Sequence, residues 1–223
     1  MRHFITALLC FSILSVFSQN KDFGIWTSGN FTYKPSKKLD FSVLPEFRWD
    51  QNVTRFRTRL IDFRGRYDIT DEWTGILVYR FAGTQRNSGW QPRRRFQLGI
   101  SYKFKYDEFT FSITSRVQRG RRLETATRDA DLNNSWRNKL EATYKGLKKL
   151  GLSISYEFFH SLMEVNRLDW TDWRWVLEGE YKLGGGHYVS MGYLVQNEFR
   201  TGPDNRDRIL LFGYKYVLKK KNK

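Results

Sequence analysis

Apolar and polar residues alternate from residue 95 to residue 118, with a short polar step at Asp107-Glu108. Successive side chains of a β-strand point to opposite faces, so the segment predicts a hairpin with one apolar face and one polar, charged face. Each arm is about ten or more residues long, the length that a tilted strand needs to cross a bilayer. The hairpin is therefore predicted to be one unit of a transmembrane β-barrel. Its apolar series before the step is Phe96, Leu98, Ile100, Tyr102, Phe104 and Tyr106.

Composition agrees with a barrel once the alternation is taken into account. The mean hydropathy of -0.62 is that of a soluble protein, but a barrel needs apolar residues only at every second position, which lowers the average. No internal segment approaches the roughly 20 apolar residues of a membrane helix. Aromatic residues make up 17% of the chain, and they favour strands and the aromatic girdles of barrels.

The first residues have the pattern of a secretory signal. Arg2 provides the positive charge, a short apolar stretch follows, and residues 1–19 are predicted to be removed. Cys10 lies within that segment and is the only cysteine, so the mature chain is predicted to have no disulfide and no thiolate metal site. Residues 20–218 are then expected to form the barrel, and residues 219–223 a basic tail.

The same alternation recurs along the rest of the chain and predicts an all-β fold: a single antiparallel transmembrane β-barrel of about 10–12 strands. Short turns alternate with longer loops, which is the asymmetry between the two ends of an outer-membrane barrel. About eleven strands can be counted, whereas bacterial barrels normally have an even number. Either one strand is not recognised, or the first segment, residues 23–33, runs downward from the outside and is not an ordinary barrel strand.

Four local features are predicted. Pro45 cannot donate a backbone hydrogen bond, so it should mark a bulge or a locally unpaired site. In the strand that begins at Arg55, the apolar positions are even-numbered up to Leu60 and odd-numbered from Ile61. A β-bulge near Leu60-Ile61 would place both sets on one face and turn five arginines inward. Residues 83–92 and 119–132 are expected to be long connections. The five arginines are Arg55, Arg57, Arg59, Arg64 and Arg66.

Charged residues of both signs occupy the predicted inner face. In a small barrel they can cross-pair and fill the lumen as a salt-bridged plug. Alternatively, the excess of arginine and lysine would give a narrow, anion-preferring pore. The predicted lumen charges are Glu46, Arg48, Arg64, Arg66, Arg80, Lys103, Lys105, Arg116, Arg137, Glu178 and Glu180, with Lys139, Glu141, Glu157, Arg174 and Lys215.

The formal net charge is +16, and a basic balance can favour nucleic acid, anionic lipid or an acidic ligand. Export by a signal peptide argues against nucleic acid. The expected partners are outer-membrane lipids, among them lipopolysaccharide, whose phosphates basic external loops could contact, and the barrel-assembly machinery during insertion. The basic loop residues are Arg93, Arg94, Arg95, Arg119, Arg121, Arg122 and Arg128.

Catalysis is not expected, and neither is a cofactor or a metal. The least favoured alternative is a lipid hydrolase that uses His160 and Ser161, with Glu157 and Glu164 nearby. Adjacent strand residues point to opposite faces, so this pair would need a bent loop to meet. The preferred hypothesis is a non-catalytic barrel with a structural or surface-associated role.

Several short motifs resemble a known family. They are Gly24-Ile25-Trp26-Thr27, Lys38-Leu39-Asp40-Phe41-Ser42, Glu46-Phe47-Arg48 and the arginine-rich strand from Arg55. Together they resemble the outer-membrane family known as domain of unknown function 2490. The resemblance covers most of the mature chain and implies a β-barrel in a Gram-negative outer membrane. It implies no activity and no catalytic residues.

Overall fold

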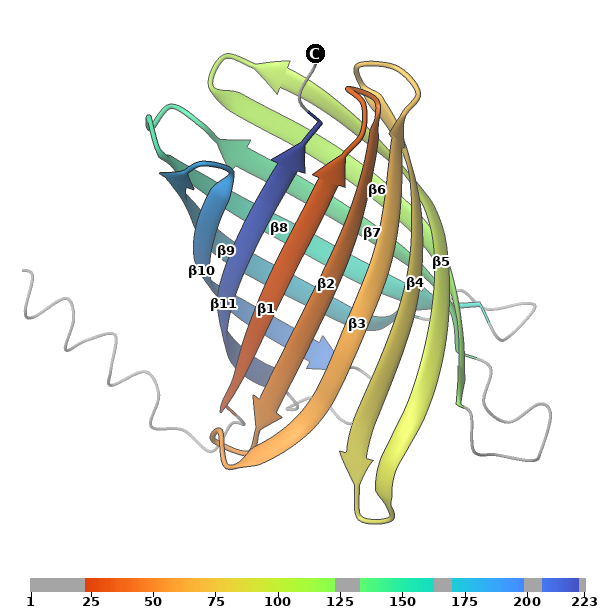
Figure 1. The fold of residues 1–223 in the computed structure, drawn as a ribbon. Helices are drawn as coiled ribbons and strands as arrows, with labels where there is room; N and C mark the ends of the chain where they lie inside the picture. Colours follow the sequence, from red (N-terminus) through yellow and green to blue (C-terminus); the bar gives the residue numbers. More distant parts are fainter. Residues whose placement is uncertain (1–22, 123–132, 163–169, 199–205, 221–223) are drawn as a thin grey trace, which may run out of the picture.

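The computed structural model describes residues 23–122, 133–162, 170–198 and 206–220. These residues form a closed barrel of eleven strands (Figure 1). The predicted signal segment, residues 1–19, lies outside the described residues. In chain order the strands are β1 (Phe23–Lys34), β2 (Leu39–Asp50), β3 (Arg55–Asp68), β4 (Trp73–Arg86), β5 (Gly89–Tyr106), β6 (Phe109–Arg122), β7 (Asn133–Tyr144), β8 (Leu150–Ser161), β9 (Trp170–Gly184), β10 (His187–Glu198) and β11 (Arg206–Lys219).

The pairing of β1 with β11 closes the barrel, and it differs from all the others. Every consecutive pair of strands is antiparallel, whereas β1 and β11 are parallel, in a register that runs from Phe23↔Arg208 to Lys34↔Lys219. An odd number of alternating strands requires this, because the first and last strands then run in the same direction. The predicted strand number is confirmed. The odd number of strands is explained as well, because the first segment is a barrel strand that starts at the end opposite the short turns (Figure 1).

The apolar face of the sheet points outward. The large apolar side chains that remain exposed lie on one parity of each strand; among them are Phe41, Phe63, Leu98, Ile113, Leu177 and Met191. Only five apolar side chains of the described chain are buried, and their cross-strand partners are inward-facing residues. The core of this protein is therefore its lumen, and the exposed face has the composition of a lipid-facing wall. The five are Leu60, Val78, Phe159, Leu194 and Ile209.

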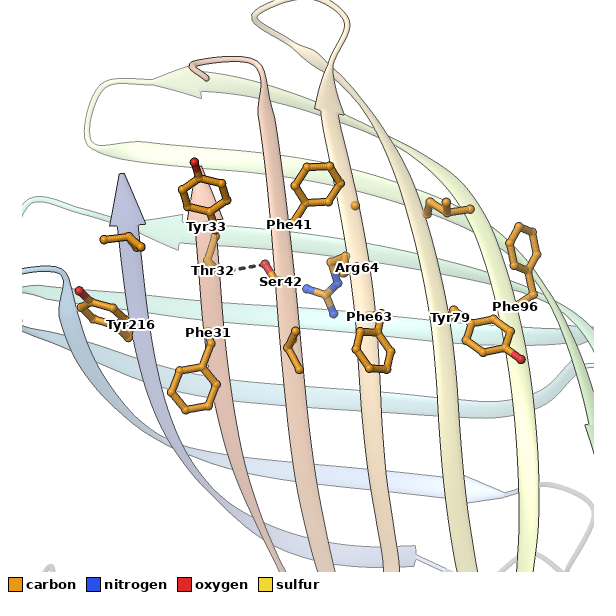
Figure 2. Close-up of a pocket in the computed structure, with 14 residues that line it drawn as sticks. Phe31, Thr32, Tyr33, Phe41, Ser42, Phe63, Arg64, Tyr79, Phe96 and Tyr216 are labelled. Carbon is orange, nitrogen blue, oxygen red and sulfur yellow. Dashed lines mark hydrogen bonds between the residues drawn. The ribbon is translucent and has the colours of Figure 1, made fainter. Parts of the chain in front are cut away.

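A shallow hollow with a volume of about 580 Å³ lies in the outer wall over β11 and β1 to β5. Figure 2 shows aromatic side chains around it, and Gly65, at an outward position, adds no side chain to it. Thr32 and Ser42 lie behind this surface and share a hydrogen bond of 2.9 Å. The labelled aromatic residues are Phe31, Tyr33, Phe41, Phe63, Tyr79, Phe96 and Tyr216.

The irregularities of β2 and β3 are only partly as predicted. The β1–β2 ladder is interrupted opposite Pro45 without a change of register, so the expected unpaired site is confirmed. The bulge expected near Leu60-Ile61 is wrong: the register shifts at Arg57, between the pairs Arg48↔Thr58 and Trp49↔Phe56. Arg59 consequently faces outward, where its guanidinium lies 4.5 Å from the ring centroid of Trp90.

The connection between β4 and β5 is shorter than predicted. Residues 83–92 were expected to form a long loop, but β4 continues to Arg86 and β5 begins at Gly89. Gly89 has a φ of 102°, a conformation that glycine adopts at low cost. Arg93, Arg94 and Arg95 therefore belong to a strand and not to a loop. This hairpin reaches beyond its neighbours at the end opposite the short turns (Figure 1).

The predicted connection at 119–132 is shorter than expected as well. Strand β6 continues to Arg122, so Arg119 is a strand residue, while Arg128 lies outside the described residues. The described part of the chain has no helix that is long and apolar enough to span a membrane.

Candidate functional site: an arginine belt in the lumen

Seven arginines and three carboxylates gather on the inner wall, and we call this set the arginine belt. Direct cross-strand neighbours connect it around the barrel: Asp62 faces Arg80, Arg80 faces Arg95, Arg116 faces Arg137, and Glu157 faces Arg174. The strands alternate in and out, so residues of one parity on neighbouring strands meet inside the barrel. The members are Arg48, Arg64, Arg80, Arg95, Arg116, Arg137 and Arg174, with Glu46, Asp62 and Glu157.

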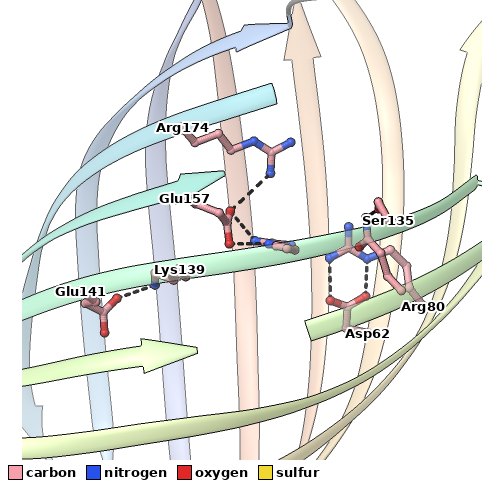
Figure 3. Close-up of polar contacts among 9 residues, drawn as sticks. Asp62, Arg80, Ser135, Lys139, Glu141, Glu157 and Arg174 are labelled. Atoms are coloured by element: carbon pink, nitrogen blue, oxygen red, sulfur yellow. Dashed lines mark hydrogen bonds and ion pairs between the residues drawn. The ribbon is translucent and has the colours of Figure 1, made fainter. Parts of the chain in front are cut away.

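Glu157 is the centre of the most heavily paired part of the belt. Its side chain is 7% exposed. It accepts hydrogen bonds from Nε and Nη2 of Arg137, the latter at 2.6 Å, and Nη1 of Arg174 lies 4.0 Å from its second oxygen (Figure 3). A buried carboxylate needs such partners, because an isolated charge in this environment is costly. One carboxylate therefore holds two guanidinium groups from β7 and β9.

Aromatic rings complete this part of the belt. The guanidinium carbon of Arg48 lies 3.6 Å from the centroid of the Trp26 ring, and that of Arg174 lies 5.9 Å from it. Phe159 contacts Arg137 and Arg174 at 5.1 and 4.8 Å in the same manner. These are cation–π distances. Because β1 and β9 are separated by β11 and β10, the contact of Arg174 with Trp26 reaches across the inner wall.

Two further ion pairs lie on β2, β3 and β4. Asp62 accepts hydrogen bonds from Nε and Nη2 of Arg80 at 2.6 and 2.7 Å, a bidentate pair whose carboxylate is 6% exposed (Figure 3). Glu46 accepts a hydrogen bond of 2.5 Å from Nε of Arg48. Bidentate arginine–carboxylate pairs are among the stronger polar contacts in proteins. Together with Arg137–Glu157–Arg174, these contacts satisfy all three carboxylates of the belt.

The remaining three arginines of the belt, Arg64, Arg95 and Arg116, have no ion pair with any carboxylate of the described chain. All three are half-buried, and the Nε atoms of Arg64 and Arg116 are buried without a hydrogen-bond partner in that part of the chain. Arg95 faces Arg80 across the β4–β5 ladder, and Arg116 faces Arg137 across the β6–β7 ladder. The β3–β6 side of the belt therefore carries uncompensated positive charge.

The other predicted lumen charges lie nearer the short turns. Lys215 donates to Glu180 at 2.5 Å and lies over the ring of Tyr188. Lys139 pairs with Glu141, and Arg66 lies 3.8 Å from Asp40. The structure also places Lys103, Lys105 and Glu178 at inward positions, with the cross-strand partners Ser112, Thr110 and Gly192.

Reasoning from the sequence missed several members of this site. Arg95 was assigned to an external loop, although it shares its parity with Gln97, the most buried large polar side chain. Asp62 was not included among the lumen charges, although it shares its parity with Arg64 and Arg66. Phe159, Leu194 and Ile209 were missed because they are apolar residues at inward positions, which simple alternation assigns to polar residues.

His160 and Ser161 lie on opposite faces of β8. The ring of His160 packs against Trp136 and Phe158, with centroids 5.6 and 5.7 Å away, whereas Ser161 faces Ser135, which accepts a hydrogen bond from the inward Gln118. The strand does not bend to bring them to one face, as a nucleophile and its base would require. Within the described residues, no group of three or more histidine, cysteine or carboxylate side chains could hold a metal ion.

Three arginines are exposed on the outside of the barrel, at the end opposite the short turns. They are Arg59, Arg94 and Arg119, on β3, β5 and β6. Arg94 faces Phe81 and Arg119 faces Phe96 across the ladders, and both phenylalanines are exposed apolar residues. Positive charge therefore borders the apolar outer wall on this side of the molecule.

The model of one protein family, described as "Protein of unknown function (DUF2490)", matches residues 23–207. The chain belongs to this family. The match spans β1 to the beginning of β11, so members of the DUF2490 family share nearly the whole barrel. No curated protein matches the chain in sequence.

Solved structures resemble the DUF2490 barrel in fold. A structure described as a NanC porin in a rhombohedral crystal form is 13% identical and covers 85% of this chain and 93% of its own, with a TM-score of 0.51. OccK11 (OpdR) from Pseudomonas aeruginosa is 12% identical over 72% of this chain and 54% of its own, with a TM-score of 0.34. The first of these likenesses shows a porin-type barrel fold.

Proposed function

We propose that this protein is a Gram-negative outer-membrane barrel that passes small anions in preference to cations, without catalysing a reaction. The uncompensated charge of the arginine belt carries this proposal: seven arginines face three carboxylates, and Arg64, Arg95 and Arg116 have no ion pair within the described chain. Rings of arginine and lysine select anions in pores. The lipid-like outer wall and the porin-type fold support the membrane location.

A purely structural lumen would be expected to balance its charges. Ion pairs that merely fill a small barrel gain by neutralising each other, because each buried charge without a partner costs free energy. The belt does this at Glu46, Asp62 and Glu157 but not at Arg64, Arg95 and Arg116. A chain that keeps three further arginines on the inner wall bears a cost that binding or passing an anion would offset.

Planar bilayers of neutral lipid provide the test. The refolded wild-type protein should conduct in steps, and its reversal potential in a potassium chloride gradient should show a preference for chloride. Arg95→Gln should reduce that preference, while Arg94→Gln, the neighbouring residue on the outer face, should leave it unchanged. A well-folded protein that does not conduct, or that prefers potassium, would contradict the proposal.

The outward arginines suggest a lipid partner. We propose that Arg59, Arg94 and Arg119 contact phosphates of lipopolysaccharide, because they are exposed beside the apolar wall at the end of the longer loops. Charge-assisted hydrogen bonds from arginine suit phosphate oxygens. Lipopolysaccharide should raise the melting temperature of the wild-type protein in detergent more than that of an Arg94→Gln, Arg119→Gln variant. Equal shifts would argue against the contact.

A further inference from the structure

Arg64 and Arg116 stand out among the unpaired arginines, because the Nε atom of each is buried without a hydrogen-bond partner in the described chain. They come from β3 and β6, on either side of the β4–β5 hairpin. On β4, Val78 is the cross-strand partner of Arg64, and the guanidinium of Arg80, two residues along the strand, is held by both oxygens of Asp62. The guanidinium groups of Arg64 and Arg116 therefore face the lumen with free donors, whereas that of Arg80 is paired with Asp62.

Arg95 lies nearer the end with the longer loops. Its partner on β6 is Gly120, and Arg116 is four residues further along β6 toward the short turns. Arg64 lies two residues beyond Asp62, also toward the short turns. An anion that enters from the loop end would therefore meet Arg95 before it reaches Arg116 and Arg64.

We propose that Arg64 and Arg116 form a binding site for an oxyanion of the phosphate or carboxylate class, with Arg95 as the residue that first attracts it. The site deepens the anion preference proposed above and rests on it. Guanidinium groups donate in a planar fork that matches two oxygens of a phosphate or carboxylate, whereas chloride offers no such pair of acceptors. Selectivity for oxyanions over chloride follows from this geometry and not from charge alone.

The ligand is a solute and not a lipid headgroup. Both arginines point inward, as their neighbours show: Arg64 faces Ser42 and Val78, which are 7% and 1% exposed, and Arg116 faces Arg137. A headgroup in the outer leaflet would meet the outward arginines Arg59, Arg94 and Arg119 instead. The two sets of arginines lie on opposite faces of the same wall and can be tested separately.

Lysine variants distinguish binding of an oxyanion at this site from a general attraction of anions to positive charge. Arg64→Lys and Arg116→Lys keep the positive charge of the belt but remove the guanidinium fork. The probe is inorganic phosphate, added to the refolded protein at constant ionic strength with chloride as the reference ion. Two quantities are measured: the rise in melting temperature in detergent, and the reduction of chloride current in a neutral bilayer.

We expect phosphate to raise the melting temperature of the wild-type protein and to reduce its chloride current, both with saturation. The double lysine variant should require about tenfold more phosphate, since it loses a charge-assisted bidentate contact, while its preference for chloride over potassium stays near that of the wild type. Lys148→Gln, at an exposed short turn outside both sets of arginines, should respond to phosphate as the wild type does.

Three outcomes would overturn the site. They are phosphate acting no better than chloride at equal ionic strength, lysine variants that bind phosphate as tightly as the wild type, and a Lys148→Gln variant in which binding is weakened equally. An anion-selective current that does not respond to phosphate would contradict the binding site but not the proposed pore. Saturable stabilisation by phosphate in a protein that does not conduct would support the binding site and contradict the pore.

Discussion

The two sides of the arginine belt differ in how their charges are compensated. On the side of β7 to β11 and β1, Glu157 holds Arg137 and Arg174, and the rings of Trp26 and Phe159 cover the guanidinium groups. On the β3–β6 side, three arginines have no carboxylate partner within the described chain. One lumen thus combines a wall on which the arginines share a carboxylate and aromatic rings with a wall on which Asp62 pairs with Arg80 alone.

The largest effect is expected where the paired side is broken. Glu157→Gln leaves Arg137 and Arg174 without their carboxylate, and removing one member of a buried ion pair typically costs about 3 to 5 kcal/mol. Urea unfolding in lipid vesicles, followed by tryptophan fluorescence, would measure the free energy of unfolding. Glu178→Gln is the control, because this inward carboxylate has no ion pair in the described chain and should change the stability by much less. Equal losses in both variants would mean that the pairing does not decide stability.

The aromatic cover of the paired side should contribute a smaller amount. Trp26→Leu keeps an apolar side chain but removes the ring that faces Arg48 at 3.6 Å. A desolvated cation–π contact is worth about 2 kcal/mol, and the same unfolding experiment should show a loss near this size. A variant as stable as the wild type would show that Glu46 alone suffices to hold Arg48.

On the unpaired side the sign should be reversed. Arg95→Gln removes a cation whose cross-strand partner is Arg80, and like charges on neighbouring strands repel by about 1 to 2 kcal/mol at an intermediate dielectric. The variant should therefore be more stable than the wild type, while it loses anion preference in the bilayer. Destabilisation would indicate that Arg95 is part of the packed wall after all.

The smallest effect is expected outside the belt. Lys215 pairs with Glu180, but the two side chains are 29% and 38% exposed, and solvent-exposed ion pairs contribute about 0 to 1 kcal/mol. Lys215→Gln should thus change the unfolding free energy by less than about 1 kcal/mol. A loss as large as that of Glu157→Gln would extend the paired region toward the short turns.

The sequence predicts the barrel well, because a wall between lipid and lumen imposes one repeating rule on every strand. Phe41, Phe63 and Leu98 face outward, as their parity predicts. The rule fails where the count is interrupted: the bulge at Arg57 shifts the parity, and its position depends on the partner strand β2. Alternation also cannot show where a hairpin ends, so the β4–β5 connection was predicted to be too long.

The partners of the lumen charges could not be predicted from parity. That Glu157 lies inward follows from its position in β8, but its pairing with the diagonal neighbour Arg137, and not with its direct partner Lys139, depends on the register of the β7–β8 ladder. The same holds for Arg174 and Trp26, which meet across two intervening strands. The sequence favours a salt-bridged plug over a pore, because small barrels tend to fill their interiors, and the proposed pore rests on the uneven pairing of the lumen charges.

The parallel contact between β1 and β11 has a consequence for assembly. Each of the other strand pairs joins neighbours in the chain and can form as soon as a hairpin exists. The closing pair joins the two ends of the chain, and contacts between distant residues are the slowest to form. Parallel ladders are also slightly less stable per residue. The seam is thus expected to close last and to separate first, which makes it the place where an assembly factor would hold the open sheet and where unfolding would begin.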